Sequence, residues 1–158
     1  MEKTITTALL ILAGVVSIVF VFNSVYPMVN RSTQAMVSMS EAIDDRMKSH
    51  VSIVHAANTT DRKTIYIWVK NVGSSRIAAI EESDLFFGQE TSFYRVPNVN
   101  YADGARPSWT YSLESGNEWL PGNTIKITIT YSGDPGPGTY YVKLVIPNGI
   151  SDEYYFSM

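Results

Sequence analysis

Hydrophobic positions follow three different patterns along the chain. Residues 5–29 are almost continuously apolar, and only Thr, Ser and Asn side chains interrupt the run. Over residues 36–47, apolar side chains recur every three or four positions, which is the period of an amphipathic helix. From residue 51 onward, apolar and polar residues alternate with the period of two that is typical of a half-buried β-strand. The pattern therefore predicts a long helix followed by an all-β domain.

The first apolar run predicts a membrane-spanning helix over residues 1–30. Its length of about 37 Å exceeds the roughly 30 Å of a hydrocarbon core. A cleaved signal peptide has a shorter apolar core and a small-residue cleavage site, so the sequence favours an uncut anchor. Charges on the two flanks are nearly balanced and leave the orientation open. The side chains predicted to form the anchor and pack the helix are Leu9, Leu10, Ile11, Leu12, Ala13, Gly14, Val15, Val16, Ile18, Val19, Phe20, Val21 and Phe22.

The second pattern predicts an amphipathic helical extension over residues 31–49. Met36, Met39, Ile43 and Met47 form its apolar stripe. Three surfaces are open as partners for this stripe: the protein's own β-domain, the same helix in neighbouring copies, or the membrane surface. Methionine suits an adaptable contact because its unbranched side chain repacks easily. The stripe is therefore a candidate for self-association.

The third pattern predicts an immunoglobulin-like β-sandwich over residues 50–158. The strongest strands are expected at 64–71, 124–131 and 139–146, and weaker ones at 51–57, 76–80, 85–87, 91–96, 108–114 and 152–158. Segments rich in Gly, Pro and Asn separate them, as turns require. Seven to nine short antiparallel strands in about 110 residues are typical of such a sandwich. The expected fold is thus an all-β sandwich preceded by a long transmembrane and amphipathic helix.

Composition argues against several functions. The net charge is −3 and only 17% of residues are charged, so no basic face for nucleic acid is expected. The chain has no Cys, which excludes disulfides and thiolate chemistry. Phosphate-binding loops, nucleophile elbows and zinc-protease motifs are also missing from the sequence. We expect a protein that is not an enzyme and has no cofactor.

Scattered polar residues give little support for a metal site. Two histidines lie five residues apart, three carboxylates cluster near residue 82, and two Asp residues stand in Gly- and Pro-rich loops, where Asp often bonds its own backbone. We interpret them as polar packing and solvated turns rather than as calcium or zinc ligands. These residues are His50, His55, Glu81, Glu82, Asp84, Asp103 and Asp134.

Two further features are candidates for contact or modification. Phe86 and Phe87 are consecutive, so in a strand one faces the core and the other, facing outward, is a candidate partner contact. Asn30 and Asn58 each begin an Asn-X-Ser/Thr triplet. Asn58, in a polar turn, is the better candidate for glycosylation if the domain faces outward.

A resemblance to a known family rests on three segments: TTALLILAGVVSIVFVFNSVYP, YIWVKNVGSSRIAAIEESDLFFG and NEWLPGNTIKITITY. Together they resemble the archaellum accessory protein G family and, more distantly, archaellins and other archaeal type IV pilin-like proteins. The most specific parts are residues 69–74 and 82–88. The resemblance covers nearly the full chain and implies a structural protein, with no catalytic residues to transfer.

The resemblance also implies a function. It implies a single-pass protein of the archaeal cytoplasmic membrane, with its amino end inside and its β-domain beneath the surface layer. There it would act as a stator component of the archaellum motor, assembling with itself and binding accessory protein F, which grips the surface-layer protein. The alternative is an archaellin or pilin-like filament subunit whose helix forms the filament core. Those subunits have a short basic prepeptide, and MEKT leaves little to cut, which favours the stator.

Overall fold

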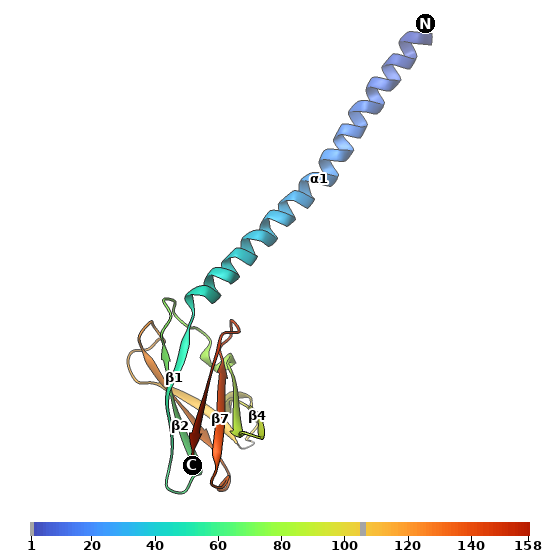
Figure 1. Ribbon diagram of the computed structural model, residues 1–158. Coiled ribbons are helices and arrows are strands. Elements are labelled where there is room, and N and C mark those ends of the chain that lie inside the picture. Colours follow the sequence, from blue (N-terminus) through green and yellow to red (C-terminus); the bar gives the residue numbers. More distant parts are fainter. Residues whose placement is uncertain (1, 105–106) are drawn as a thin grey trace. The chain divides into compact units, whose positions relative to one another are not determined.

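The computed structural model describes residues 2–104 and 107–158. The chain divides into two compact units, of which the first ends at Ile43 and the second runs from Asp44 to Met158. One long helix, α1 (Glu2–Lys48), makes up the first unit and contributes its last turn to the second. The predicted long amino-terminal helix is therefore confirmed (Figure 1).

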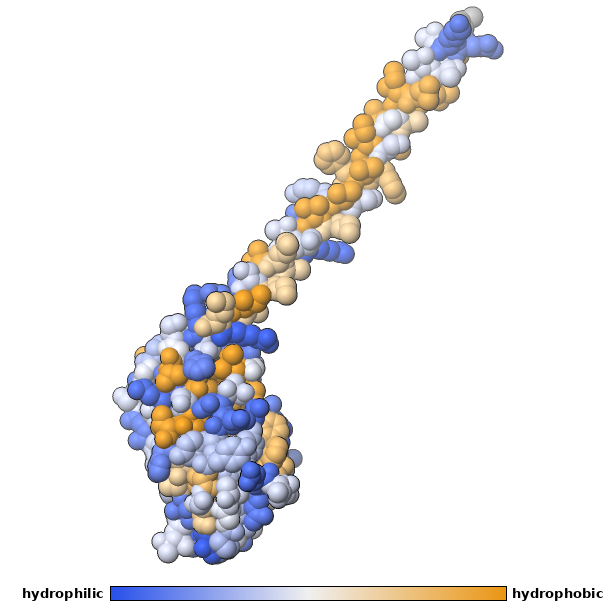
Figure 2. Space-filling model, in the orientation of Figure 1, coloured by the Kyte–Doolittle hydropathy of each residue, from blue (hydrophilic) through white to orange (hydrophobic). Residues whose placement is uncertain are grey.

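Polar side chains in the first half of α1 are satisfied within the helix itself. The hydroxyls of Thr6, Thr7 and Ser17 each donate to the carbonyl oxygen four residues earlier, at 2.8–2.9 Å. Such back-bonding removes the need for water at these positions. None of the described residues of α1 is buried. The helix therefore leaves its apolar side chains exposed, and Figure 2 shows orange side chains along the face in view.

The second unit is a sandwich of two four-stranded antiparallel sheets, with strand orders β1-β2-β6-β5 and β4-β3-β7-β8. This confirms the predicted immunoglobulin-like sandwich. Two short 3₁₀ helices, η1 (Ile80–Glu82) and η2 (Val99–Tyr101), lie in its connections. The strands are β1 (Val51–Asn58), β2 (Thr64–Asn71), β3 (Asp84–Gln89), β4 (Ser92–Val96), β5 (Ser108–Leu113), β6 (Thr124–Thr130), β7 (Thr139–Val145) and β8 (Ser151–Ser157).

The core between the sheets follows the alternation seen in the sequence. Alternate residues of β2 and β6 lie fully buried and directly opposite each other, as Ile67 and Ile127 do. Apolar area buried in this way is the main favourable term in folding. The fully buried side chains with the largest volumes are Trp109, Trp119, Tyr140, Phe87, Ile65, Ile67, Leu85, Ile125, Ile127, Ile129, Leu144 and Ile146.

Tyr140 fixes the corner that leads into β7. Its ring is buried against Phe87, with ring centroids 5.5 Å apart. Its hydroxyl lies 2.8 and 2.9 Å from the carbonyl oxygens of Pro135 and Gly136. A tyrosine whose hydroxyl bonds the backbone a few residues upstream is a recurrent feature of immunoglobulin-like sandwiches.

The weak strand expected at residues 76–80 does not form. Only Ile77 pairs there, in an isolated bridge to Trp119. Ala79 has a φ of 52°, in the left-handed region, and the chain then enters η1. A single left-handed residue breaks the extended backbone that a ladder requires, so the segment is a connection with buried anchors at Ile77 and Ile80.

Candidate anchoring and docking surfaces

The apolar half of α1 is a continuous hydrophobic surface. The Leu, Ile, Val and Phe side chains predicted to form the anchor between positions 9 and 22 are each 52–71% exposed. Ala13 and Gly14 are exposed as well, and a Cβ at Gly14 would meet nothing within 4 Å. By length and composition, α1 is the one helix among the described residues that is suited to cross a membrane.

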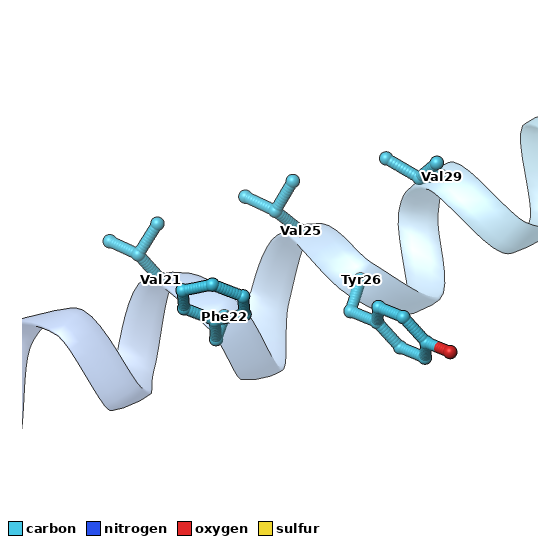
Figure 3. Close-up of a pocket in the computed structure, with 5 residues that line it drawn as sticks. All are labelled: Val21, Phe22, Val25, Tyr26 and Val29. Carbon is cyan, nitrogen blue, oxygen red and sulfur yellow. The ribbon is translucent and has the colours of Figure 1, made fainter.

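A shallow apolar hollow lies farther along the same helix. Val21, Val25 and Val29 form a row at intervals of four residues, and Phe22 and Tyr26 stand beside them (Figure 3). Residues four apart on a helix are neighbours on its surface, so a groove runs between the two rows. Such grooves accept the side chains of a second helix or a lipid chain.

The methionine stripe is exposed over its whole length. Met36 and Met39 are 72% and 67% exposed, Ile43 is 49% exposed and Met47 is 82% exposed. Within the helix itself, the stripe is therefore available for contact.

The last turn of α1 is held by the β unit through its backbone. The carbonyl oxygen of Lys48 accepts hydrogen bonds from the backbone N–H of Ser74 and Ser75, at 2.8 and 3.3 Å. On another side, the Arg46 guanidinium donates to the Asn148 carbonyl oxygen at 2.9 Å. The two bonds to Lys48 satisfy a carbonyl that a helix end otherwise leaves free. Residues 44–48 therefore belong to the sandwich as much as to the helix.

Asn71 organises the connection that grips this helix end. Its fully buried side chain donates to the carbonyl oxygens of Ser75 and Trp119, at 2.9 and 3.2 Å, and accepts the Gly73 N–H at 3.0 Å. The Asn71 amide therefore ties together the loop against Lys48 and the loop that carries Trp119. Asn71 lies inside the segment 69–74, which was singled out for its resemblance.

The outer face of the β4-β3-β7-β8 sheet carries an aromatic row. Phe93, Gly88, Tyr141 and Tyr155 lie opposite one another on the four strands. Ring centroids are 4.8 Å apart for Phe93 and Tyr141, and 5.1 Å apart for Tyr141 and Tyr155. A Cβ at Gly88 would lie 2.6 Å from the Phe93 Cα, so glycine is required between the rings. Burial raises the pKa of Tyr141 to about 12, and its hydroxyl donates to Glu153 at 2.9 Å.

The two consecutive phenylalanines of β3 separate as the alternation predicts. Phe87 is 0% exposed and packs on Tyr140 in the core. It cannot contact a partner, which corrects its inclusion among the candidate contacts. Phe86 faces outward and half-buried, between Arg95 of β4 and Lys143 of β7. Phe86 thus lies on the same face as the aromatic row, in the neighbouring row formed with Arg95 and Lys143.

Similar proteins identify the family of this chain. The model of the archaeal-type flagellin family matches residues 4–156, which include nearly all of α1 and the sandwich. The chain belongs to the archaeal-type flagellin family. More closely, it is a FlaG-family protein, as the predicted resemblance to accessory protein G stated.

Two solved structures support the FlaG assignment. The archaellum periplasmic stator protein FlaG from Sulfolobus acidocaldarius is 29% identical; the match covers 68% of this chain and 99% of that one, with a TM-score of 0.59. A chain of the FlaF–FlaG stator complex from the same organism is 31% identical over 67% and 87% of the two chains, with a TM-score of 0.57. An uncharacterised protein from Archaeoglobus fulgidus is 26% identical over 165 residues, covering 99% of this chain and 98% of the relative.

The remaining candidate residues of this FlaG-family protein do not converge. His55 stacks on Trp68, with ring centroids 5.5 Å apart, whereas His50 is exposed. Glu81 accepts the Tyr111 hydroxyl at 3.3 Å, and Asp84 pairs with Arg95. Among the described residues, no group of three or more His, Asp or Glu side chains is arranged to hold a metal ion.

The loop carboxylate Asp134 has a structural partner instead. It forms a two-pronged ion pair with Arg62, with nitrogen–oxygen distances of 2.7–3.2 Å, and accepts the Gly136 N–H at 2.8 Å. The Arg62 guanidinium lowers the pKa of Asp134 to about 2. This pair joins the β1–β2 turn to the β6–β7 loop.

The two glycosylation triplets lie in different settings. Asn30 is exposed on α1. Asn58 is the last residue of β1, and its half-buried carboxamide donates to the Thr59 carbonyl oxygen at 2.9 Å. A glycan at Asn58 requires this bond to open, and its addition stays a prediction.

Sequence patterns missed two features of this family member. Tyr94 and Phe93 are both exposed on β4, at 44% and 51%, and strand periodicity does not distinguish an edge strand from a central one. From the sequence, Asn71 is predicted only to be the last residue of a strand. Its position before Val-Gly-Ser was the only signal of the buried network.

Proposed function

We propose that this protein is a membrane-anchored component of the archaellum stator. The observation that carries the proposal is the combination of a helix suited to cross a membrane with a sandwich similar to the periplasmic stator protein FlaG. In this proposal α1 spans the archaeal cytoplasmic membrane once, with its amino end inside. The sandwich then lies beneath the surface layer.

The anchor of the proposed stator is the apolar segment at residues 5–29. It contains fourteen Leu, Ile, Val and Phe residues, each worth about −0.3 to −0.6 kcal/mol on insertion. Together they contribute about −4 to −8 kcal/mol. Because the mean cost of one Arg at the helix centre is about 3 kcal/mol, a single charge is insufficient to release the protein.

A stator transmits force, so its anchor and its binding domain must be joined firmly. The backbone bonds from Ser74 and Ser75 to Lys48, and the bond from Arg46 to Asn148, support this role. They are spread over two different loops, so the last helical turn is fixed to the sandwich at two places. The proposed load path therefore leads from α1 into both loops.

The proposed partners follow from the relative. The Sulfolobus protein is known in a complex with FlaF, and we infer that this protein binds a FlaF-type partner, and through it the surface layer. Self-assembly of the copies, with the methionine stripe and the outward residue Phe86 as contacts, belongs to the same proposal. In this proposal lipid surrounds the anchor, and the protein binds neither a cofactor nor nucleic acid.

A filament subunit is the second candidate function. The observation that favours it is the match of the archaeal-type flagellin family model to residues 4–156. In that case α1 packs in a filament core rather than in lipid. The two functions differ in where the protein is found: in the membrane fraction or as the bulk protein of sheared filaments.

Deletion and fractionation test the proposal. Deleting the gene should abolish swimming while filaments persist, and the tagged protein should sediment with membranes and resist alkaline extraction. The double variant Leu12→Arg/Val16→Arg should lose both membrane retention and swimming, whereas the apolar control Leu12→Ile/Val16→Ile should keep both. Loss of filaments on deletion, with the protein recovered from sheared filaments, would contradict the stator.

A further inference from the structure

Strand β4 is an unusually exposed edge of the sandwich. It ends the sheet β4-β3-β7-β8 and lies at one margin of the β unit, where Figure 1 labels it. Its residues 92–95 are all exposed, and Phe93 and Tyr94 are 51% and 44% exposed despite their size. Exposed apolar edges promote pairing with other strands unless they are blocked.

The other edges of the sandwich are blocked by contacts within the chain. Between β1 and β8, the Asp152 carboxylate accepts the backbone N–H of Ile53 at 2.7 Å, beside an irregularity in the β1 register. On β5, the Trp109 N–H donates to the Pro97 carbonyl oxygen at 3.0 Å, and the Tyr111 hydroxyl bonds Glu81. The Tyr94 hydroxyl lies 2.9 Å from the Tyr131 hydroxyl, but no hydrogen bond to the outward backbone groups of β4 occurs among the described residues.

The hydrogen-bond pattern shows which groups of β4 face outward. The Glu90 N–H donates to the Thr139 carbonyl oxygen on β7. Successive residues of a strand point their N–H groups in opposite directions, so the preceding residue, Gln89, points its N–H toward β4. Gln89, opposite Ser92, closes the two-residue hairpin, and such closing pairs are hydrogen-bonded. Alternation then directs the N–H and C=O groups of Phe93 and Arg95 away from β3.

We propose that β4 pairs with β4 of a second copy, antiparallel and centred on Tyr94. In this register Phe93 faces Arg95 of the second copy, and both of these pairs are hydrogen-bonded because their backbone groups already point outward. The arrangement uses every outward N–H and C=O at positions 93 and 95. A centre on Phe93 would engage the turn residue Thr91 instead, and a centre on Arg95 would bring two like charges together.

Side chains favour the same register. On the outer face, the Arg95 guanidinium of one copy lies beside the Phe93 ring of the other, a pairing of cation and aromatic face that is attractive. The row of Phe93, Tyr141 and Tyr155 then meets the row of Arg95, Phe86 and Lys143 of the second copy, and the two sheets join into one of eight strands. The use of this contact in the cell rests on the stator proposal, for which it supplies a route to self-assembly.

Cysteine cross-linking of the purified full-length chain, in detergent or lipid vesicles, tests the register. The chain has no native Cys, so each engineered residue reports alone. Tyr94→Cys places two Cα atoms about 4.5 Å apart in a non-hydrogen-bonded pair, within the range for a disulfide. In a dimer of two Phe93→Cys chains, or of two Arg95→Cys chains, the two cysteines are diagonal neighbours about 7–8 Å apart. A disulfide should therefore form only when Phe93→Cys chains are mixed with Arg95→Cys chains.

The matched control is Thr110→Cys, an exposed position on the other edge strand, β5. We expect at least tenfold more disulfide-linked dimer from Tyr94→Cys than from Thr110→Cys, Phe93→Cys alone or Arg95→Cys alone. Equal cross-linking at any of these control positions would overturn the proposed pairing. Melting curves confirm that each variant is folded.

Phe93→Lys provides a second measurement without cysteine chemistry. A lysine on an edge strand opposes pairing while the pairing of β4 with β3 remains. The dissociation constant of the dimer, measured by sedimentation, should rise at least tenfold. An unchanged dissociation constant would overturn the proposal. Both readouts use the isolated protein, so they stand or fail independently of whether deletion of the gene abolishes swimming.

Discussion

Gly73 lies against the end of the long helix so closely that no other residue fits there. A Cβ added at Gly73 would lie 2.4 Å from the Lys48 carbonyl oxygen and 2.5 Å from the His50 nitrogen. All of these contacts are with backbone, which cannot move aside as a flexible side chain can. Glycine at this position therefore lets the loop of residues 72–75 reach the helix end and donate to Lys48.

Replacing Gly73 with alanine should loosen this joint. Overpacking of this kind costs about 1–3 kcal/mol, and we expect the Gly73→Ala chain to lose that much stability in denaturant unfolding of the sandwich. The matched control is Gly133→Ala, because a Cβ at Gly133 would meet nothing within 4 Å. Equal melting of the two variants would show that the contact with Lys48 does not constrain the chain.

Asn71→Ala should destabilise the sandwich through unpaired backbone groups. Its side chain serves the Ser75 and Trp119 carbonyls and the Gly73 N–H. Each buried group left without a partner costs about 1–3 kcal/mol. The exposed Asn117 supplies a control, and Asn117→Ala should change the unfolding free energy by less than about 0.5 kcal/mol. A small loss for Asn71→Ala would mean that water replaces the amide.

The ion pair of Arg62 and Asp134 predicts an acid-dependent loss of stability. The folded pKa of Asp134 is about 2, below the usual value of about 3.9 for the unfolded chain. The ionised carboxylate therefore stabilises the fold above about pH 4, and this contribution disappears as the pH falls toward 2. The Asp134→Asn variant should melt earlier than the parent chain at pH 5 and converge with it near pH 2. Parallel melting curves across this range would contradict the prediction.

Asp152 closes the edge between β1 and β8, and its removal should expose that edge. Asp152→Ala leaves the Ile53 N–H without its acceptor at 2.7 Å. We expect a loss of about 1–3 kcal/mol together with self-association at high concentration. Asp152→Asn retains an acceptor oxygen and should recover much of the loss. If Asn and Ala variants behave alike by light scattering and unfolding, the carboxylate does not protect this edge.

The fold class followed from local periodicity because the relevant forces are local. Ile65, Ile67 and Val69 alternate with Tyr66 and Trp68, and the first set is fully buried. A strand with one apolar face has only one way to bury it. The segment at 76–80 was misread because a single left-handed residue, Ala79, ends the extended backbone, and alanine carries no signal for that conformation.

The candidate surfaces were harder to read from sequence. Strand alternation separated Phe86 from Phe87 only once the register of β3 had fixed which of them faces the core. Phe93 and Tyr94 could not be recognised as an open edge, because edge position depends on which strands pair with β3 far along the chain.

By itself, the sequence determined that a long apolar helix precedes an antiparallel sandwich. Each of the two hydrophobic patterns, the continuous apolar run and the alternation, can be removed from water in only one way. It also determined the absence of disulfides. Only the tertiary structure decided which loops hold the last turn of the helix, which carboxylate closes one edge, and which strand is left open. Those contacts join residues about 25 to 100 positions apart, such as Lys48 with Ser74 and Ile53 with Asp152, and no local pattern encodes them.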